Sequence, residues 1–87
     1  MIMDHKRKRL LFHCTHMGMK ENDVMFGEFA RAHVQDLDDA QVAELEALLE
    51  NNDQDLFHWV MGQAEVPAIW DTEMMKRLKA FNKVQQS

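Results

Sequence analysis

The chain has 87 residues, a net charge of −5 at pH 7, and 46% hydrophobic and 29% charged residues. This length fits a single domain, and the composition is typical of a folded protein rather than a disordered one. The single cysteine excludes an internal disulfide bond. No apolar run reaches the roughly 20 residues that cross a bilayer, and the N-terminus lacks a secretory signal pattern. We therefore expect a cytoplasmic protein without direct membrane insertion.

The charges are unevenly distributed along the chain. A basic run covers residues 6–9, whereas neither Lys nor Arg occurs between Arg31 and Lys76, a gap that is rich in Asp and Glu. This acidic middle repels phosphate backbones, so we expect no nucleic-acid binding. The basic run is interpreted as a solvated first helical turn, which can also orient the protein towards an acidic partner.

Apolar residues recur at helical spacing throughout the chain, and the alternating runs typical of strands are missing from the sequence. We predict an all-α fold, a compact five-helix bundle that forms one domain over residues 1–87. Residues 1–3 and 84–87 are expected to fray.

The first predicted helix spans about residues 4–17. Asp4 is its expected N-cap, and Gly18 is expected to end it as a C-terminal glycine. Its apolar stripe includes Leu10, Leu11, Cys14 and Met17. The second predicted helix spans about residues 20–33 and carries acids in its first turn, where the helix dipole favours them.

The third predicted helix has the clearest start signal, a capping box formed by Asp38 and Gln41, and it ends at residues 51–52. Asp53 is the expected cap of a fourth helix, which ends near Gly62. A fifth helix is predicted from about residues 69–71 to residue 83. Trp59 and its neighbour Phe57 are interpreted as core residues. Short connections predict that neighbouring helices pack roughly antiparallel.

The segment HCTHMGMKEND (residues 13–23) places two histidines and the cysteine close together. A structural zinc site needs four ligands, and the chain has no second cluster of Cys and His to complete one. Cys14 lies on the apolar stripe, so we interpret it as a small core residue and the histidines as surface residues. We therefore expect neither a metal site nor catalytic residues, and no enzymatic activity of its own.

The helix junction M-G-M-K-E-N-D (residues 17–23) is the other feature of this segment. Gly18 lets two helices meet at a sharp angle with exposed backbone. Glu21 follows closely, and its side chain either folds back onto first-turn amides or points outwards. The residue pattern leaves both options open.

This stretch also resembles a known family. RKRLLFHCTHMGMKENDVMFGEFA (residues 7–30) is similar to the signature region of the small succinate dehydrogenase assembly factors that promote covalent flavin attachment, both the bacterial factor and its mitochondrial counterpart. The family pattern has R-L-L, then R-G-x-x-E-x-D. NNDQDLFHWVMGQ (residues 51–63) and EMMKRLKAF (residues 73–81) look like later segments of the family, so the resemblance covers about residues 6–82.

The resemblance implies that Gly18, Glu21 and Asp23 bind a partner protein, with Glu21 as the direct polar contact and Asp23 as a contact or a helix support. Met17 stands where the family has an arginine, so the role of that arginine does not carry over. Weaker candidates for partner contacts are Met17, His16, Lys20 and Arg9.

The function that the resemblance implies is that of an assembly chaperone. Such a protein binds the flavoprotein subunit of succinate dehydrogenase or fumarate reductase and promotes attachment of FAD to a histidine of that subunit. FAD is then held by the partner, and we expect the chain itself to bind no cofactor stably and to be a monomer. The alternative is a general protein-interaction or antitoxin-like regulatory module without flavinylation activity.

Overall fold

The computed structural model describes the backbone of residues 4–86 and the side chains of residues 4–83. Within this range the chain forms five α-helices and two short 3-10 helices and no strand, which confirms the all-α prediction. None of the described helices combines the length and apolar character needed to cross a membrane. The predicted fraying of residues 1–3 and 87 falls outside the described residues, and the backbone of residues 84–86 is helical. The elements are α1 (His5–Thr15), α2 (Lys20–His33), η1 (Val34–Asp36), α3 (Asp39–Leu48), α4 (Asp53–Met61), η2 (Ala68–Trp70) and α5 (Glu73–Gln86).

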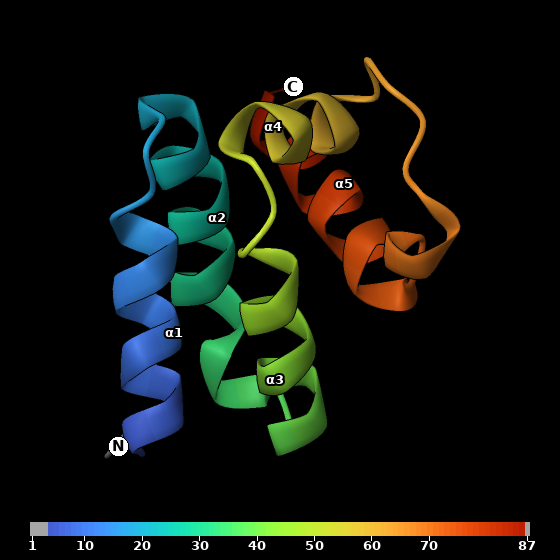
Figure 1. Ribbon diagram of the computed structural model, residues 1–87. Coiled ribbons are helices and arrows are strands. Elements are labelled where there is room, and N and C mark those ends of the chain that lie inside the picture. Colours follow the sequence, from blue (N-terminus) through green and yellow to red (C-terminus); the bar gives the residue numbers. More distant parts are fainter. Residues whose placement is uncertain (1–3, 87) are drawn as a thin grey trace.

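The first three helices lie side by side and alternate in direction, as the short connections predict (Figure 1). α1 packs against α2 and α3, and α2 also packs against α4 and α5. In Figure 1, α4 lies across the end of the molecule that carries the α1–α2 connection. This arrangement brings the N-termini of α2 and α4 to the same end of the bundle.

A single hydrophobic core joins the five helices. Leu10 and Cys14 of α1 are fully buried in it, which confirms that the predicted stripe faces inwards. Trp59 is only 8% exposed, which confirms its predicted role in the core. The same prediction for Phe57 is wrong, because Phe57 is only half-buried and lies outside the core cluster. The largest of the other fully buried apolar side chains are Phe26, Phe29, Leu37, Leu45, Leu56 and Met75.

Two of the predicted helix starts are confirmed by their hydrogen bonds. The Asp4 carboxylate accepts a bond of 2.9 Å from the backbone N–H of Arg7. At α3, the Asp38 carboxylate accepts from the N–H of Gln41 at 2.8 Å, and the Gln41 side chain accepts from the N–H of Asp38 at 2.9 Å. This reciprocal pair is the predicted capping box.

The predicted cap of the fourth helix is wrong by one residue. Asn52 has extended backbone angles, and its side-chain oxygen accepts a 2.8 Å bond from the N–H of Gln54. Asp53 is already the first residue of α4. Asn and Asp are about equally good N-caps, so the choice between these neighbours depended on where the chain turns.

The predicted ends of the first and third helices and the start of the fifth also need correction. α3 ends at Leu48 rather than at residues 51–52. α1 ends at Thr15 and is capped by His16, so Gly18 does not end it. Among the described residues, only Gly62 has a positive φ, 77°, at the C-cap of α4. Residues 68–70 form the separate 3-10 helix η2 after Pro67, and α5 begins later, at Glu73.

Arg7 fastens the start of α1 to the start of α3. Its guanidinium group donates hydrogen bonds to the carboxylates of Asp4 at 2.6 Å and Asp39 at 3.2 Å. It also donates to the backbone carbonyl of Leu37, and its side chain is only 15% exposed. The backbone N–H of Arg7, and to a smaller extent its guanidinium charge, lower the pKa of the Asp4 carboxyl group.

Candidate functional site

The connection between α1 and α2 is held from inside α2 by Asp23. The Asp23 carboxylate accepts a hydrogen bond from the backbone N–H of Met17, six residues earlier in the chain. Asp23 is half-buried, and Met17 is also half-buried and packs against the core. Asp23 therefore supports the shape of the connection, which is one of the two roles that the resemblance left open.

Gly18 is exposed at this connection and lies against the start of α4. Its φ is not positive, so the backbone here does not require a glycine for conformational reasons. A Cβ atom at this position would overlap the carboxylate oxygen Oδ2 of Asp53. The glycine therefore provides room for a side chain of α4, and a larger residue would force the Asp53 carboxylate to rotate away.

Asn22 is a site residue that the sequence reasoning missed. It is fully buried, and its Nδ2 donates a 2.8 Å hydrogen bond to the backbone carbonyl of Asp53. Its Oδ1 is buried without a hydrogen-bond partner among the described residues. Asn22 therefore ties the N-terminus of α2 to that of α4. Its position one turn before the core residue Phe26 was the available signal, because it places an amide on the apolar face of α2.

Glu21 and Lys20 are exposed in the first turn of α2. Within the part of the chain that the structure describes, neither side chain forms a hydrogen bond or an ion pair. Glu21 therefore does not fold back to cap the helix, and of the two options left open the outward one is correct. The N-cap residue of α2 is Met19, which provides no side-chain cap.

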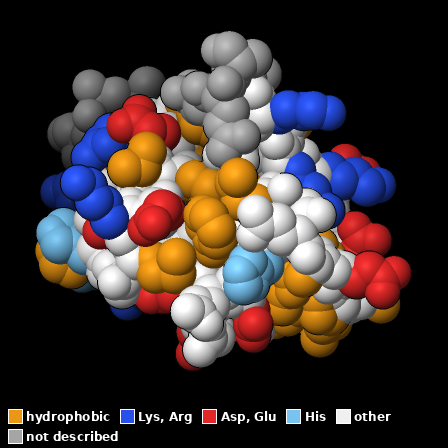
Figure 2. Space-filling view, turned by 90° about the horizontal axis from the view of Figure 1, so that it is seen from above, with side chains coloured by type: hydrophobic (Ala, Val, Ile, Leu, Met, Phe, Trp, Pro, Cys, Tyr) orange, Lys and Arg blue, Asp and Glu red, His pale blue; other side chains and the backbone are white. Residues whose placement is uncertain are grey.

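Both residues lie at a groove of about 610 Å³ between α2, α4 and α5. Val24 borders this groove and is 55% exposed. Figure 2 looks onto this end of the molecule and shows apolar side chains that gather between acidic and basic ones. The remaining lining residues are Met25, Phe57, Met61 and Asn82.

The cluster of His13, Cys14 and His16 is not a joint site. The His13 ring is 3.2 Å from a carboxylate oxygen of Glu46, whereas the His16 ring stacks on Phe12 with 4.0 Å between ring centroids. Cys14 points into the core, and burial, with a smaller contribution from Glu46, raises the pKa of its thiol to about 12. Among the described residues, no three His, Cys, Asp or Glu side chains are arranged to hold a metal ion.

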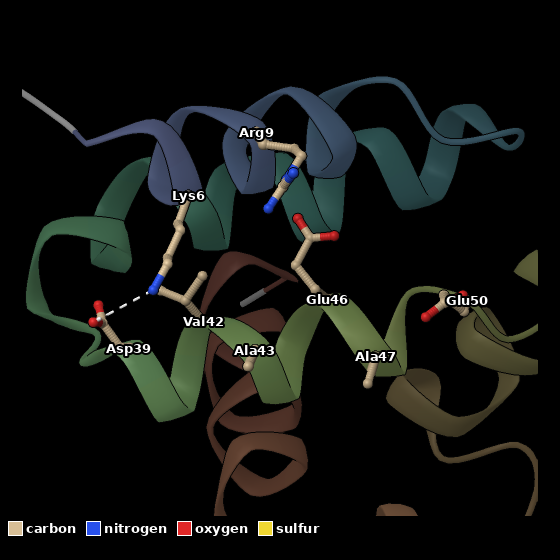
Figure 3. A pocket seen from close by; sticks show the side chains of 8 residues that line it. All are labelled: Lys6, Arg9, Asp39, Val42, Ala43, Glu46, Ala47 and Glu50. Atoms are coloured by element: carbon tan, nitrogen blue, oxygen red, sulfur yellow. Dashed lines mark ion pairs between the residues drawn. The ribbon is translucent and has the colours of Figure 1, made fainter.

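Arg9 lies at a different place from the other candidates. It lines a shallow charged groove of about 350 Å³ between α1 and α3, and Figure 3 shows its guanidinium group pointing towards Glu46. Lys6 reaches across the same groove to Asp39, with 3.7 Å between the charged atoms. Arg9 therefore does not share the groove at Glu21, and His16 is held against α1 by its contacts with Phe12. The structure brings together Gly18, Lys20, Glu21 and Asp23, and leaves Arg9 apart.

The fold and the site define a class: a small all-helical domain with an apolar surface groove beside an exposed helix junction. Residues 8–82 match the family described as the flavinator of succinate dehydrogenase. The chain belongs to this family.

Several curated relatives agree with the family match. The chain is 39% identical over 70 residues to mitochondrial succinate dehydrogenase assembly factor 2 of Dictyostelium discoideum, covering 80% of this chain and 50% of the relative. It is 34% identical over 79 residues to assembly factor 2-B of Drosophila melanogaster, covering 88% and 51%. With assembly factor 2 of Danio rerio the identity is 31% over 83 residues, covering 93% and 52%.

The chain spans about half the length of the curated relatives it matches. The names of these three relatives place those proteins in mitochondria. The cytoplasmic location stays a prediction from the sequence.

Proposed function

We propose that this protein is an assembly chaperone that binds the flavoprotein subunit of succinate dehydrogenase, or of the related fumarate reductase, and promotes covalent attachment of FAD to a histidine of that subunit. The observation that carries the proposal is the family match over residues 8–82, together with an exposed junction at the positions of the family motif. In this proposal the chain acts as a monomer and contributes no catalytic group.

Each residue of the junction has a distinct role in the proposed complex. Glu21 is the direct polar contact, because it is exposed and has no partner among the described residues. Gly18 keeps the exposed junction free of a side chain that would displace the Asp53 carboxylate. Asp23 and Asn22 hold the junction in place through their bonds to Met17 and Asp53.

The protein promotes the reaction through its partner rather than through its own contact with FAD. The carboxylates of Glu21, Asp23 and Asp53 lie around the junction, and they disfavour contact with the diphosphate of FAD. Binding instead shifts the flavoprotein towards a conformation in which FAD and its acceptor histidine are close and aligned. The size of this shift is limited by the difference in the chaperone's affinity for the two conformations of the flavoprotein. Holding FAD and the histidine in the reactive orientation before the reaction lowers the barrier to bond formation.

The direct test is reconstitution from purified components. The flavoprotein subunit without covalent flavin is incubated with FAD, with or without this protein, and covalent flavin is measured by fluorescence of the denatured subunit in a gel. We expect the wild-type chain to raise covalent flavin, and Glu21→Gln to lose most of that gain. Loss of a hydrogen-bonded charge costs about 1.5–3 kcal/mol, or about 10- to 100-fold in affinity.

Glu28→Gln is the matched control for Glu21→Gln. Glu28 is exposed on the same helix and pairs only with Arg31, at 3.2 Å among the described residues. This control is expected to behave as the wild type. No gain in covalent flavin with the wild-type chain would contradict the proposal and favour the general interaction module.

A further inference from the structure

The groove between α2, α4 and α5 is lined by apolar side chains and by two charged residues, Lys20 and Glu21, that form no ion pair among the described residues. We propose that it receives a segment of the flavoprotein subunit in which a large apolar side chain is flanked by an arginine or a lysine. This inference rests on the proposed function, and it specifies the chemistry of the partner segment at the same site.

The apolar part of the inference rests on Val24 and the groove volume. Val24 is 55% exposed although α2 contributes several residues to the core, and Phe57 and Met25 lie beside it as half-buried lining residues. The volume of about 610 Å³ lies within the range of roughly 300–1,000 Å³ typical of ligand sites. One large aliphatic or aromatic side chain of a partner therefore fits, and its burial removes the exposed surface of Val24 from water.

The charged part of the inference rests on Glu21. Glu21 and Val24 are three residues apart in α2, so they share one face of the helix. A carboxylate at the edge of an apolar groove interacts more strongly with a cation once a partner has displaced water from the site. Glu21 has no ion pair among the described residues, so a partner cation does not have to displace an existing one.

The local charge favours a basic segment over an acidic one. The carboxylates of Glu21, Asp23 and Asp53 lie around the junction, and Lys20 is the one basic residue among the described residues that line the groove. The whole chain carries a net charge of −5. Lys20 is the one unfavourable group for a partner cation, because it lines the same groove.

The test measures the affinity of the full chain for the purified flavoprotein subunit by isothermal titration calorimetry at low and high salt. We expect Val24→Ser to weaken binding by about tenfold, the order for losing burial of roughly half a valine side chain. Glu21→Gln weakens binding mainly at low salt and reduces the salt dependence, whereas Lys20→Gln strengthens it. Ile69→Ser is the control, because Ile69 is 74% exposed in η2 and does not line the groove.

Several results would overturn the inference. Unchanged affinity of Val24→Ser means that the groove is not the contact surface, while normal binding of the wild type keeps the proposed function. Tighter binding of Glu21→Gln with weaker binding of Lys20→Gln means that the partner segment is acidic. A wild-type dimer in light scattering that Val24→Ser dissociates assigns the groove to a second copy of the chain. Tighter binding after removal of residues 84–87 assigns it to the chain's own C-terminus. No binding by the wild type refutes the proposed function as well.

Discussion

Substitution of Asn22 by Asp changes only one side-chain group, but we expect it to lower the free energy of unfolding strongly. Asn22 is fully buried, and its amide donates to the carbonyl of Asp53. A carboxylate in this place cannot donate, and it would face a carbonyl oxygen inside the protein. The introduced group must therefore take up a proton or lose its burial.

The magnitude follows from the cost of burying a carboxyl group. Full burial raises such a pKa by about 3–5 units, from an ordinary value of about 3.9. A native pKa near 7 costs about 4 kcal/mol at pH 7, since each unit corresponds to about 1.4 kcal/mol. Because the unfolded group also becomes protonated on acidification, the cost falls to about 1.5 kcal/mol at pH 5. Against a total stability of about 5–15 kcal/mol, the loss at pH 7 is severe.

Urea unfolding followed by circular dichroism at pH 7 and pH 5 measures both values. Asn52→Asp is the matched control, because it makes the same chemical change at the exposed cap of α4, where Asp caps about as well as Asn. We expect this control to keep wild-type stability. An Asn22→Asp variant that is as stable as the control at pH 7 would refute the burial and the hydrogen bond on which the reasoning depends.

Three further predictions concern stability and binding. The free energy of unfolding falls by about 1.4 kcal/mol per pH unit as the pH rises from 9 towards 12, because the buried Cys14 thiol keeps its proton when the unfolded thiol has lost it. In urea unfolding, the Cys14→Ala variant lacks this contribution to the pH dependence. A wild-type slope in that variant would contradict the prediction. The Arg7→Met variant loses about 1.5–3 kcal/mol of unfolding free energy, or roughly 10 °C in melting temperature, because the hydrogen bonds of the guanidinium group are lost. Substitution of the exposed Arg9 by Met changes the melting temperature little, and equal melting temperatures of the two variants would contradict this prediction. In Gly18→Ala the added methyl group displaces the Asp53 carboxylate, so we expect weaker binding of the flavoprotein in calorimetry and a free energy of unfolding within about 1 kcal/mol of the wild type. A large loss of stability would show that the Asp53 carboxylate cannot rotate away.

The fold was largely predictable, because its signals are local. The capping box at Asp38 and the apolar stripe through Leu10 and Cys14 depend on neighbours three or four residues away. The cap of α4 was misassigned because Asn52 and Asp53 have similar capping ability, and only the backbone angles separate them.

The site was less predictable, because it depends on contacts between distant segments. The motif residues around Gly18 were found by resemblance, but the reason for that glycine lies in α4, where Asp53 occupies the space of a side chain. Asn22 was missed because its partner is a backbone carbonyl of another helix. The groove beside Glu21 needs three helices to form, so no short stretch of sequence could reveal it.

The most direct test of the central claim is hydrogen–deuterium exchange of this chain, free and in complex with the flavoprotein subunit. The amides of Lys20 and Glu21 have no intrahelical acceptor, both residues are exposed, and Met19 provides no side-chain cap, so these amides exchange quickly in the free protein. Binding through the junction and its groove predicts slower exchange in residues 18–22, with little change along the α1–α3 groove of Figure 3. Protection confined to the α1–α3 groove, with residues 18–22 unchanged, would contradict the account.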